Sequence, residues 1–242
     1  MRTPCTQCPL RKLPMFSGFT EDELAFMNRF KVAERHVERG ATVLKEGESS
    51  AELYTVLSGQ GIRYMTLENG RRQVINFLFP GDLAGLQGGL TGEMSHSVEA
   101  SSPMVLCVFD RARLWELFRN QPERSYDLTW ISAVQEHFLG ETIASLGQRD
   151  ALQRVAWALL RMHERLSALG LLEAGSVPLP FRQQDLADAL GLSLVHTNKT
   201  IGKLRDAGLA NWAEGRLTVA DRRQLASLAL VDLERVEVRP LM

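Results

Sequence analysis

One helical stretch broken by a glycine constrains this chain more than any other part. Residues 181–209 read FRQQDLADALGLSLVHTNKTIGKLRDAGL, with apolar residues at helical spacing on both sides of Gly191. Glycine is the residue best able to adopt a positive φ in a sharp turn, and Ser193 stands where a helix N-cap is expected. Because the small Ala187 also permits a close crossing, the pattern predicts a helix-turn-helix.

The charge of this stretch points to nucleic acid. Residues 191–205 include three cations and no acid, in a chain of net charge −1. In a helix-turn-helix the second helix enters the major groove, where its early residues face base edges and cations meet phosphates. An ordinary helical hairpin with solvated lysines is the alternative. The residues that we expect to contact DNA are Ser193, Val195, His196, Asn198, Lys199, Lys203, Arg205 and, on a following hairpin, Arg216.

The first half of the chain has a sequence pattern typical of β-structure. Between residues 34 and 109, short apolar runs are separated by glycines at roughly the 8–12 residue spacing of a sandwich or barrel. Asn69-Gly70 is a strong hairpin signal. Since strands and helices do not alternate, we expect an α+β chain whose all-β part precedes its helices.

A long helix is predicted to begin at Pro122. We interpret its apolar stripe as a homodimer interface, because two-fold pairing is the commonest oligomeric arrangement. Packing of this helix along the β-domain of the same chain is the alternative. The stripe consists of Leu128, Ile131, Val134 and Phe138.

Composition limits the cellular setting. The chain is 45% hydrophobic and 24% charged, which is typical of a soluble globular protein, and its near-neutral charge excludes a protein that coats nucleic acid. It contains no apolar run of roughly 18 or more residues and no signal-peptide pattern. We therefore expect a cytoplasmic protein with no membrane partner.

Catalytic motifs are missing from the sequence. The five histidines are scattered, and G-x-S-x-G, P-loop and G-x-G-x-x-G patterns are absent. We therefore expect no catalytic residues and no enzyme activity. Two rival interpretations stay open, a cupin-type metalloenzyme and a signal-responsive scaffold that does not bind DNA.

The order of these parts is similar to that of the CRP/FNR family of bacterial transcription regulators. The stretch RRQVINFLFPGDLAG, residues 71–85, resembles the family's β-roll, and the glycine-broken stretch above resembles its DNA-reading motif. The resemblance spans nearly the whole chain. It implies a homodimer on a near-palindromic promoter site, controlled by a signal and acting through RNA polymerase. The implied parts are an N-terminal arm (1–18), a cyclic-nucleotide-binding-like β-roll or double-stranded β-helix (19–120), a long dimerisation helix (121–149) and a winged helix-turn-helix (150–242).

The effector pocket implied by this resemblance departs from the cyclic-nucleotide pattern. Members that bind cyclic nucleotide carry Gly-Glu-Leu and then Arg-Ser or Arg-Thr, whereas this chain has Gly-Leu-Gln from Gly85 and Met-Ser-His ending at His96. Without the acid and the cation, burying a cyclic phosphate is costly, which argues against cyclic AMP. We expect an effector pocket for some other ligand, such as an anion, around Arg63, Gly85, Gln87 and His96.

The cysteines resemble part of the ligand set of FNR-type oxygen sensors, which hold a 4Fe–4S cluster with cysteines near the N-terminus and one in the β-roll. Cys5, Cys8 and Cys107 occupy such positions, but Pro14 stands where a further cysteine is expected. A cluster normally takes four thiolates. An iron–sulfur cluster with an outside ligand, zinc, a reversible disulfide and inert structural thiols are the alternatives.

The recognition helix also departs from the family pattern. Val195 and Lys199 stand where CRP and FNR types generally present Glu and Arg, so the usual half-site is not expected. We expect His196, Asn198 and Lys199 to carry direct readout of the bases.

Overall fold

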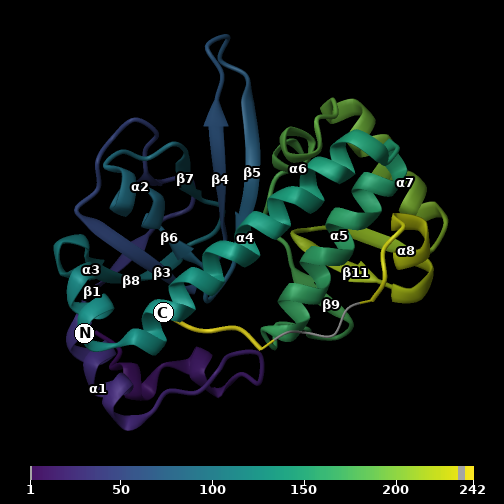
Figure 1. The fold of residues 1–242 in the computed structure, drawn as a ribbon. Helices are drawn as coiled ribbons and strands as arrows, with labels where there is room; N and C mark the ends of the chain where they lie inside the picture. The colour runs from purple at the N-terminus through teal and green to yellow at the C-terminus, as the bar shows by residue number, and fades with distance from the viewer. Residues whose placement is uncertain (1, 234–237) are drawn as a thin grey trace. The chain divides into compact units, whose positions relative to one another are not determined.

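The computed structural model describes residues 2–233 and 238–242 of the chain (Figure 1). The chain divides into two compact units, Met1–Glu136 with Val238–Met242, and His137–Glu237. The first unit is the β-rich part predicted from the sequence, and the second contains the helix-turn-helix.

Two antiparallel sheets of four strands form the body of the first unit. One sheet has the order β1-β8-β3-β6 and the other β2-β7-β4-β5. Small and branched apolar side chains, such as those of Val56, Val98 and Leu106, fill its core. The strands are β1 Lys31–Val37, β2 Thr42–Leu44, β3 Glu52–Ser58, β4 Gly61–Thr66, β5 Arg72–Leu78, β6 Leu83–Ala84, β7 Ser97–Ala100 and β8 Met104–Asp110.

The hairpin predicted at Asn69-Gly70 is confirmed. Thr66 pairs with Arg72 across the β4–β5 turn, Gly70 has a φ of +77°, and the Asn69 Oδ1 accepts a hydrogen bond of 3.0 Å from the Arg71 backbone N–H. Asparagine and glycine suit such a turn because they tolerate positive φ. The hairpin stands out from the rest of this unit (Figure 1).

Short helices border the sheets of the first unit. The longest of them is α1, whose N-cap Thr20 forms a capping box with Glu23, an arrangement that the spacing Thr-x-x-Glu favours. These helices are η1 Cys5–Gln7, η2 Pro9–Lys12, α1 Glu21–Phe30, α2 Leu86–Thr91, η3 Arg111–Arg113 and α3 Leu114–Asn120.

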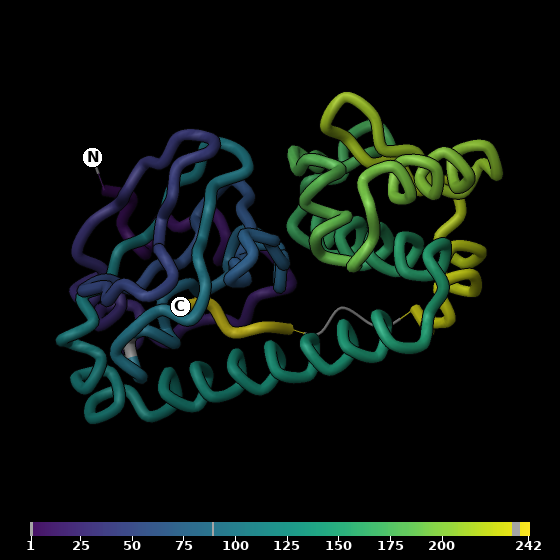
Figure 2. Tube along the Cα trace, turned by 90° about the horizontal axis from the view of Figure 1, so that it is seen from above, coloured from purple at the N-terminus to yellow at the C-terminus, as the bar shows by residue number. Residues whose placement is uncertain are grey.

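The long helix predicted to begin at Pro122 is α4, Pro122–Gln148. It continues through Gly140 and Gly147 without a break (Figure 2). Its first half belongs to the first unit and its second half to the second, so the helix is not a separate part between them.

The structure corrects the dimer stripe predicted on this helix. Leu128 and Ile131 are only 3% and 2% exposed within the single chain. Val134 is partly buried, and Phe138 stacks on Trp157 of the second unit with ring centroids 6.1 Å apart. The prediction was wrong for Leu128 and Ile131, because amphipathic spacing identifies a buried face but not the surface that buries it. For Val134 and Phe138 the dimer contact stays a prediction.

The second unit is a winged helix-turn-helix. Its elements are α5 Ala151–Ala168, β9 Ser176–Pro178, α6 Gln183–Leu190, α7 Leu194–Asp206, β10 Ala210–Ala213, β11 Arg216–Val219 and α8 Arg222–Ala229. The three strands pair in the order β10-β11-β9. Glu214 and Gly215, both with positive φ, form the turn between β10 and β11, and this hairpin is the one that carries Arg216.

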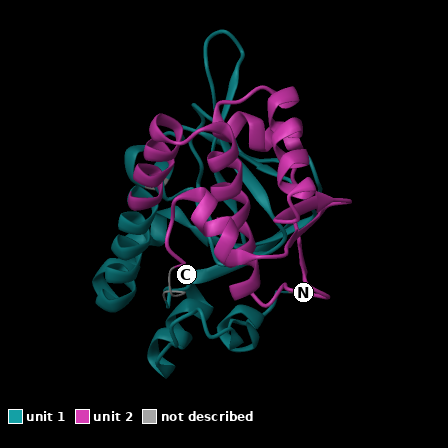
Figure 3. Cartoon of the chain, turned by 90° about the vertical axis from the view of Figure 1, so that its right-hand side faces the viewer, with its two compact units in different colours: residues 1–136, 238–242 teal, residues 137–237 magenta. Residues whose placement is uncertain are grey.

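The last residues of the chain differ from the predicted division. Val238–Met242 belong to the first unit rather than to the winged helix-turn-helix (Figure 3). Arg239 forms a parallel β-bridge with Phe16, and Leu241 and Met242 are buried. The boundary at residue 242 was wrong because burial of two apolar side chains and backbone pairing favour this position over solvent.

Candidate DNA-binding interface and sensor sites

The turn between α6 and α7 has the geometry that its sequence predicts. Gly191 caps α6 with a φ of +64°, and the Leu192 backbone N–H donates to the Ala187 carbonyl at 3.1 Å. The Ser193 hydroxyl then accepts a 3.2 Å hydrogen bond from the His196 N–H at the start of α7. These bonds satisfy some of the backbone groups left unpaired where α6 ends and α7 begins, and they fix the turn between the two helices.

One face of α7 is buried and determines which residues face outward. Thr197, Thr200, Ile201 and Leu204 are buried, at the i, i+3, i+4 and i+7 spacing of a helix face packed on its neighbours. The opposite face carries all the predicted α7 contacts, and every one of them is exposed. These residues are Val195, His196, Asn198, Lys199, Lys203 and Arg205, with Ser193 at the cap.

Two of the three cations on this face are free to meet a ligand. The Lys199 and Lys203 side chains form no ion pair or hydrogen bond with any residue that the structure describes. Arg205 instead pairs with Asp206 at 3.1 Å, an exposed contact of small energy that solvent screens. The outward face of α7 therefore presents a local positive charge.

Arg216 does not have the free side chain that the sequence suggests for a wing. Its guanidinium donates to the Ser176 hydroxyl at 2.8 Å and to the Ser176 carbonyl at 3.1 Å, and it lies 3.7 Å from the Glu173 carboxylate. The side chain therefore links β11 to β9 through hydrogen bonds. A phosphate contact by Arg216 would have to compete with these bonds.

The buried Trp212 holds the wing in place. Its indole Nε1 donates to the Leu179 carbonyl at 3.1 Å across the sheet that contains β10. A buried indole usually finds such a partner, so the side chain supplies both packing and register.

Two of the predicted effector residues come together in the first unit. Arg63 is buried, and its guanidinium donates to the Leu83 carbonyl and, at 3.3 Å, to Oε1 of Gln135 on α4. Burial, and then the nearby Arg63 charge, lower the pKa of His96 to about 4. Arg63 Nε and His96 Nε2 have no hydrogen-bond partner in the structure.

The other two predicted effector residues have different environments. Gly85 is buried with a φ of +93°, and a Cβ there would lie 3.1 Å from the Glu52 carbonyl, so the backbone requires glycine. Gln87 is exposed, and a Gln side chain that faces solvent does not line a buried pocket. Gln87 therefore does not share the buried surroundings of Arg63 and His96, and its part in an effector pocket stays a prediction.

The three cysteines line one small cavity in the first unit. Its volume is about 30 Å³, room for one or two water molecules. Cys5, Cys8 and Cys107 share the lining with Lys31, whose Nζ lies 2.6 Å from the Glu34 carboxylate and donates to the Thr3 carbonyl at 2.8 Å. Burial raises the pKa of Cys107 to about 11 and also raises the pKa of Cys5.

These residues do not fit an iron–sulfur cluster or zinc. The described part of the chain has no group of three or more His, Cys, Asp or Glu side chains arranged to hold a metal ion. The cavity is also small, and the buried ammonium of Lys31 occupies its wall where a metal would need an anionic ligand. Of the interpretations left open by the sequence, thiol chemistry and inert thiols are the ones these contacts suit.

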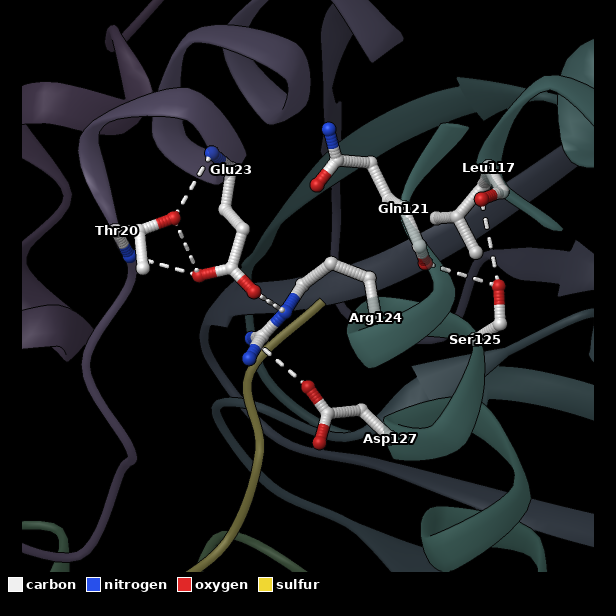
Figure 4. Close-up of polar contacts among 7 residues, drawn as sticks. All are labelled: Thr20, Glu23, Leu117, Gln121, Arg124, Ser125 and Asp127. Carbon is white, nitrogen blue, oxygen red and sulfur yellow. Dashed lines mark hydrogen bonds and ion pairs between the residues drawn. The ribbon is translucent and has the colours of Figure 1, made fainter. Parts of the chain in front are cut away.

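The sequence did not reveal the ion network that joins α1 to the start of α4 (Figure 4). Arg124 Nε donates to Glu23 at 3.0 Å, and Arg124 Nη1 lies 2.8 Å from Asp127. Thr20 hydrogen-bonds the same Glu23 carboxylate. The Thr-x-x-Glu spacing was visible in the sequence, but a partner 101 residues away was not.

The helices of the described residues include none that is both long and apolar enough to cross a bilayer.

Comparisons with known proteins agree with this architecture. Residues 34–121 match the cyclic nucleotide-binding domain family, and residues 153–228 match the Crp-like helix-turn-helix domain family. The chain is 30% identical over 227 residues to the nitrogen fixation regulation protein FixK of Bradyrhizobium diazoefficiens, a match that covers 93% of each chain. It is 27% identical over 225 residues to the transcriptional activator protein FnrL of Cereibacter sphaeroides, covering 91% of this chain and 90% of FnrL.

A solved structure is also similar to this chain over most of its length. The structure of FixK2 from Bradyrhizobium japonicum matches with a TM-score of 0.74 and 25% identity, covering 84% of this chain and 98% of that one. These relatives are transcription regulators rather than enzymes.

Proposed function

The chain belongs to the CRP/FNR family of DNA-binding transcription regulators, and from that premise we propose that it binds a near-palindromic promoter site as a homodimer. In this proposal α7 is the recognition helix, and RNA polymerase is the partner that responds when the protein is bound to DNA. The observation that carries the proposal is the outward face of α7, where Lys199 and Lys203 lie exposed without an acidic partner among the described residues.

The chemistry of the first two turns of α7 supports direct base contact. Asn198 can bond bidentately to adenine, Lys199 donates to guanine or phosphate, and Val195, which is 64% exposed, suits a thymine methyl group. We assign direct readout to His196, Asn198 and Lys199, and phosphate contact to Lys203. Arg216 contributes less, because its guanidinium is already bonded to Ser176, whereas the exposed and weak pair with Asp206 leaves Arg205 able to meet a phosphate.

The exposed face of α4 supports a dimer seam that differs from the predicted stripe. Tyr126 and Ile143 are 67% and 70% exposed although both are large and apolar. Tyr126, Ala133 and Gly140 recur every seven residues along this face, which is the heptad spacing of paired helices. The small side chains at Ala133 and Gly140 allow a second helix to approach closely.

The Arg63 group supports an input site in the β-roll. The unsatisfied Arg63 Nε is a donor, and the unsatisfied Nε2 of neutral His96 donates in one of its two tautomers, so together they suit an acceptor such as a small anion. Cyclic nucleotide is not the ligand that we propose, because Met94 stands buried where the resemblance places the phosphate-binding Arg. Arg63 also contacts α4 through Gln135, which connects this input to the proposed seam.

The test is selection of DNA from a random pool by the purified full chain, followed by titration of the selected site at several salt concentrations. We expect a two-fold symmetric site and an affinity that falls steeply with salt, as phosphate contacts require. Recovery of no enriched sequence, or binding that salt does not change, would contradict the proposal. Arg119→Ala on α3, a loss of one exposed charge in the first unit, is the matched control for lysine variants of α7.

A further inference from the structure

Residues 238–242 make backbone contacts with the segment that precedes α1. The Arg239 N–H donates to the Met15 carbonyl at 2.8 Å, and the Ser17 N–H donates to the Arg239 carbonyl at 2.8 Å. The two hydrogen bonds flank the parallel bridge between Phe16 and Arg239. The segment is therefore paired with the body of the first unit rather than lying loosely against it.

A mostly buried ion pair fixes the same segment to the β-roll. Arg239 Nη1 lies 3.3 Å from Asp82 Oδ1, and the two side chains are only 18% and 12% exposed. Asp82 precedes Leu83, the residue whose carbonyl accepts a hydrogen bond from Arg63. The segment thus adjoins the proposed input site of the β-roll.

The end of the segment closes the cysteine cavity. Leu241 and Met242 are 4% and 8% exposed, and both line the cavity together with Cys5, Cys8 and Cys107. They supply apolar surface to the wall around the thiols. In the order of the chain, the segment comes after α8, the last helix of the DNA-binding unit in the described residues.

We propose that residues 238–242 act as a strap, which closes the cysteine cavity and links its state to the DNA-binding unit. While the strap is docked, the thiols are covered and the chain that leaves the DNA-binding unit has its end paired with the first unit. When the strap leaves, both constraints are released together. By linkage, any event that favours an open cavity, such as modification of a thiol, also favours release of the strap.

Burial explains why the thiols respond to the strap. It is the largest cause of the raised pKa of Cys107, and a protonated, covered thiol reacts slowly. Removing Leu241 and Met242 from the wall admits water and lowers that desolvation. The thiols should therefore become more reactive, although no residue that hydrogen-bonds or pairs with them has changed.

The first experiment measures alkylation of each cysteine by N-ethylmaleimide, in the full chain and in a variant lacking residues 238–242, with peptide mass spectrometry as readout. We expect Cys107 to react roughly tenfold faster or more in the shortened chain, since thiol reactivity follows thiolate fraction and access. Met242→Ser and Arg239→Ala, which keep the chain length, should give smaller increases. Leu67→Ser, at a residue of the β4–β5 turn that is 56% exposed, is the control and should give none.

An unchanged Cys107 rate in a shortened chain that keeps its circular dichroism spectrum would overturn the closing role. If the shortened chain loses that spectrum, the two point variants decide, and equal rates in both and in the control would overturn it as well.

The second experiment measures the linking role by hydrogen exchange and needs no DNA. We expect amides of α8 to exchange several-fold faster in the shortened chain and in the full chain after alkylation, since release removes a constraint from this end of the unit. Exchange in α8 that stays unchanged in both samples would overturn the link, whether or not the protein binds DNA.

Discussion

Arg63 on β4 and Gln135 on α4 are joined by a hydrogen bond of 3.3 Å between Nη1 and Oε1. The residues lie 72 positions apart in the sequence, and the bond connects the β-roll to the long helix inside the first unit. Arg63 also donates to the Leu83 carbonyl of β6, so one buried cation on a strand of one sheet contacts a strand of the other sheet and the helix. A ligand that attracts this guanidinium would therefore change a contact to α4.

Replacing Gln135 tests the energy of this contact. Gln135→Leu removes the acceptor of a buried charged donor, and we expect the free energy of unfolding to fall by about 1–3 kcal/mol. Urea denaturation measures the change. Gln148→Leu, at an exposed position of the same helix, should alter stability by less than about 0.5 kcal/mol. Equal effects of the two substitutions would show that the Arg63 bond contributes nothing.

Lys203 tests the phosphate contact proposed for α7. We expect Lys203→Ala to weaken binding to specific and unrelated DNA alike, and to reduce the slope of log affinity against log salt by about one. Fluorescence anisotropy over a salt series measures both quantities. Arg119→Ala should leave the slope as it is, and a Lys203 variant that behaves in the same way would remove this residue from the interface.

Asn198 tests base readout rather than charge. Asn198→Ala should cost about 1–3 kcal/mol at one base pair of each half-site and relax the preference there, without changing the salt slope. Sequencing of DNA selected by the variant shows the preference position by position. A profile identical to that of the unmodified chain would exclude Asn198 from direct readout.

Two isoleucines of α4 distinguish the proposed seam from the core. Ile143→Glu places like charges opposite each other in a dimer, so we expect dimer affinity to fall more than about tenfold while the fold persists. Ile131→Ala instead leaves a cavity inside the chain and should cost about 2–5 kcal/mol of stability. Sedimentation velocity and urea denaturation separate the two effects. Dissociation caused by Ile131→Ala but not by Ile143→Glu would restore the stripe predicted from the sequence.

His96 tests the pH dependence of the β-roll. Burial and the Arg63 charge lower the pKa of His96 to about 4 in the folded chain, against an ordinary value of 6.5. Between these values the unfolded chain binds more protons than the folded chain, so the stability associated with neutral His96 is complete above about pH 6.5 and is lost as pH falls toward 4. We expect His96→Leu to reduce this loss, measured by urea denaturation at several pH values. His137→Leu, at an exposed position, is the control, and an equal change in both variants would contradict the burial argument.

Sequence patterns predict those structural features whose cause lies within a few neighbouring residues. The Gly191 turn, the Ser193 cap, the Asn69-Gly70 hairpin and the capping box at Thr20 each depend on the conformational preference or hydrogen bonding of adjacent residues. The exposed face of α7 was predictable for the same reason, because four buried residues at helical spacing define the opposite face. Together with the resemblance to known regulators, these signals identified the α+β architecture and the DNA-binding motif.

The dimer stripe and the effector residues were less predictable from the sequence. The apolar period of α4 identified its buried face, but Leu128 and Ile131 turned out to pack in their own chain. Gln87 was expected beside Arg63 from its place in the sequence, and α2 carries it to the surface. In both cases the pattern describes one element, whereas the surroundings of that element depend on the rest of the fold.

The sequence by itself determined the order of the elements, the turn of the helix-turn-helix and the residues that α7 presents, because helix period, capping and glycine conformation act over a few residues. Only the tertiary structure decided which distant groups meet. Arg124 pairs with Glu23, Lys31 shares a cavity with three cysteines, and Leu241 and Met242 close that cavity from the far end of the chain. Such contacts depend on how two sheets and a returning segment pack together, and no local preference of the residues involved encodes that packing.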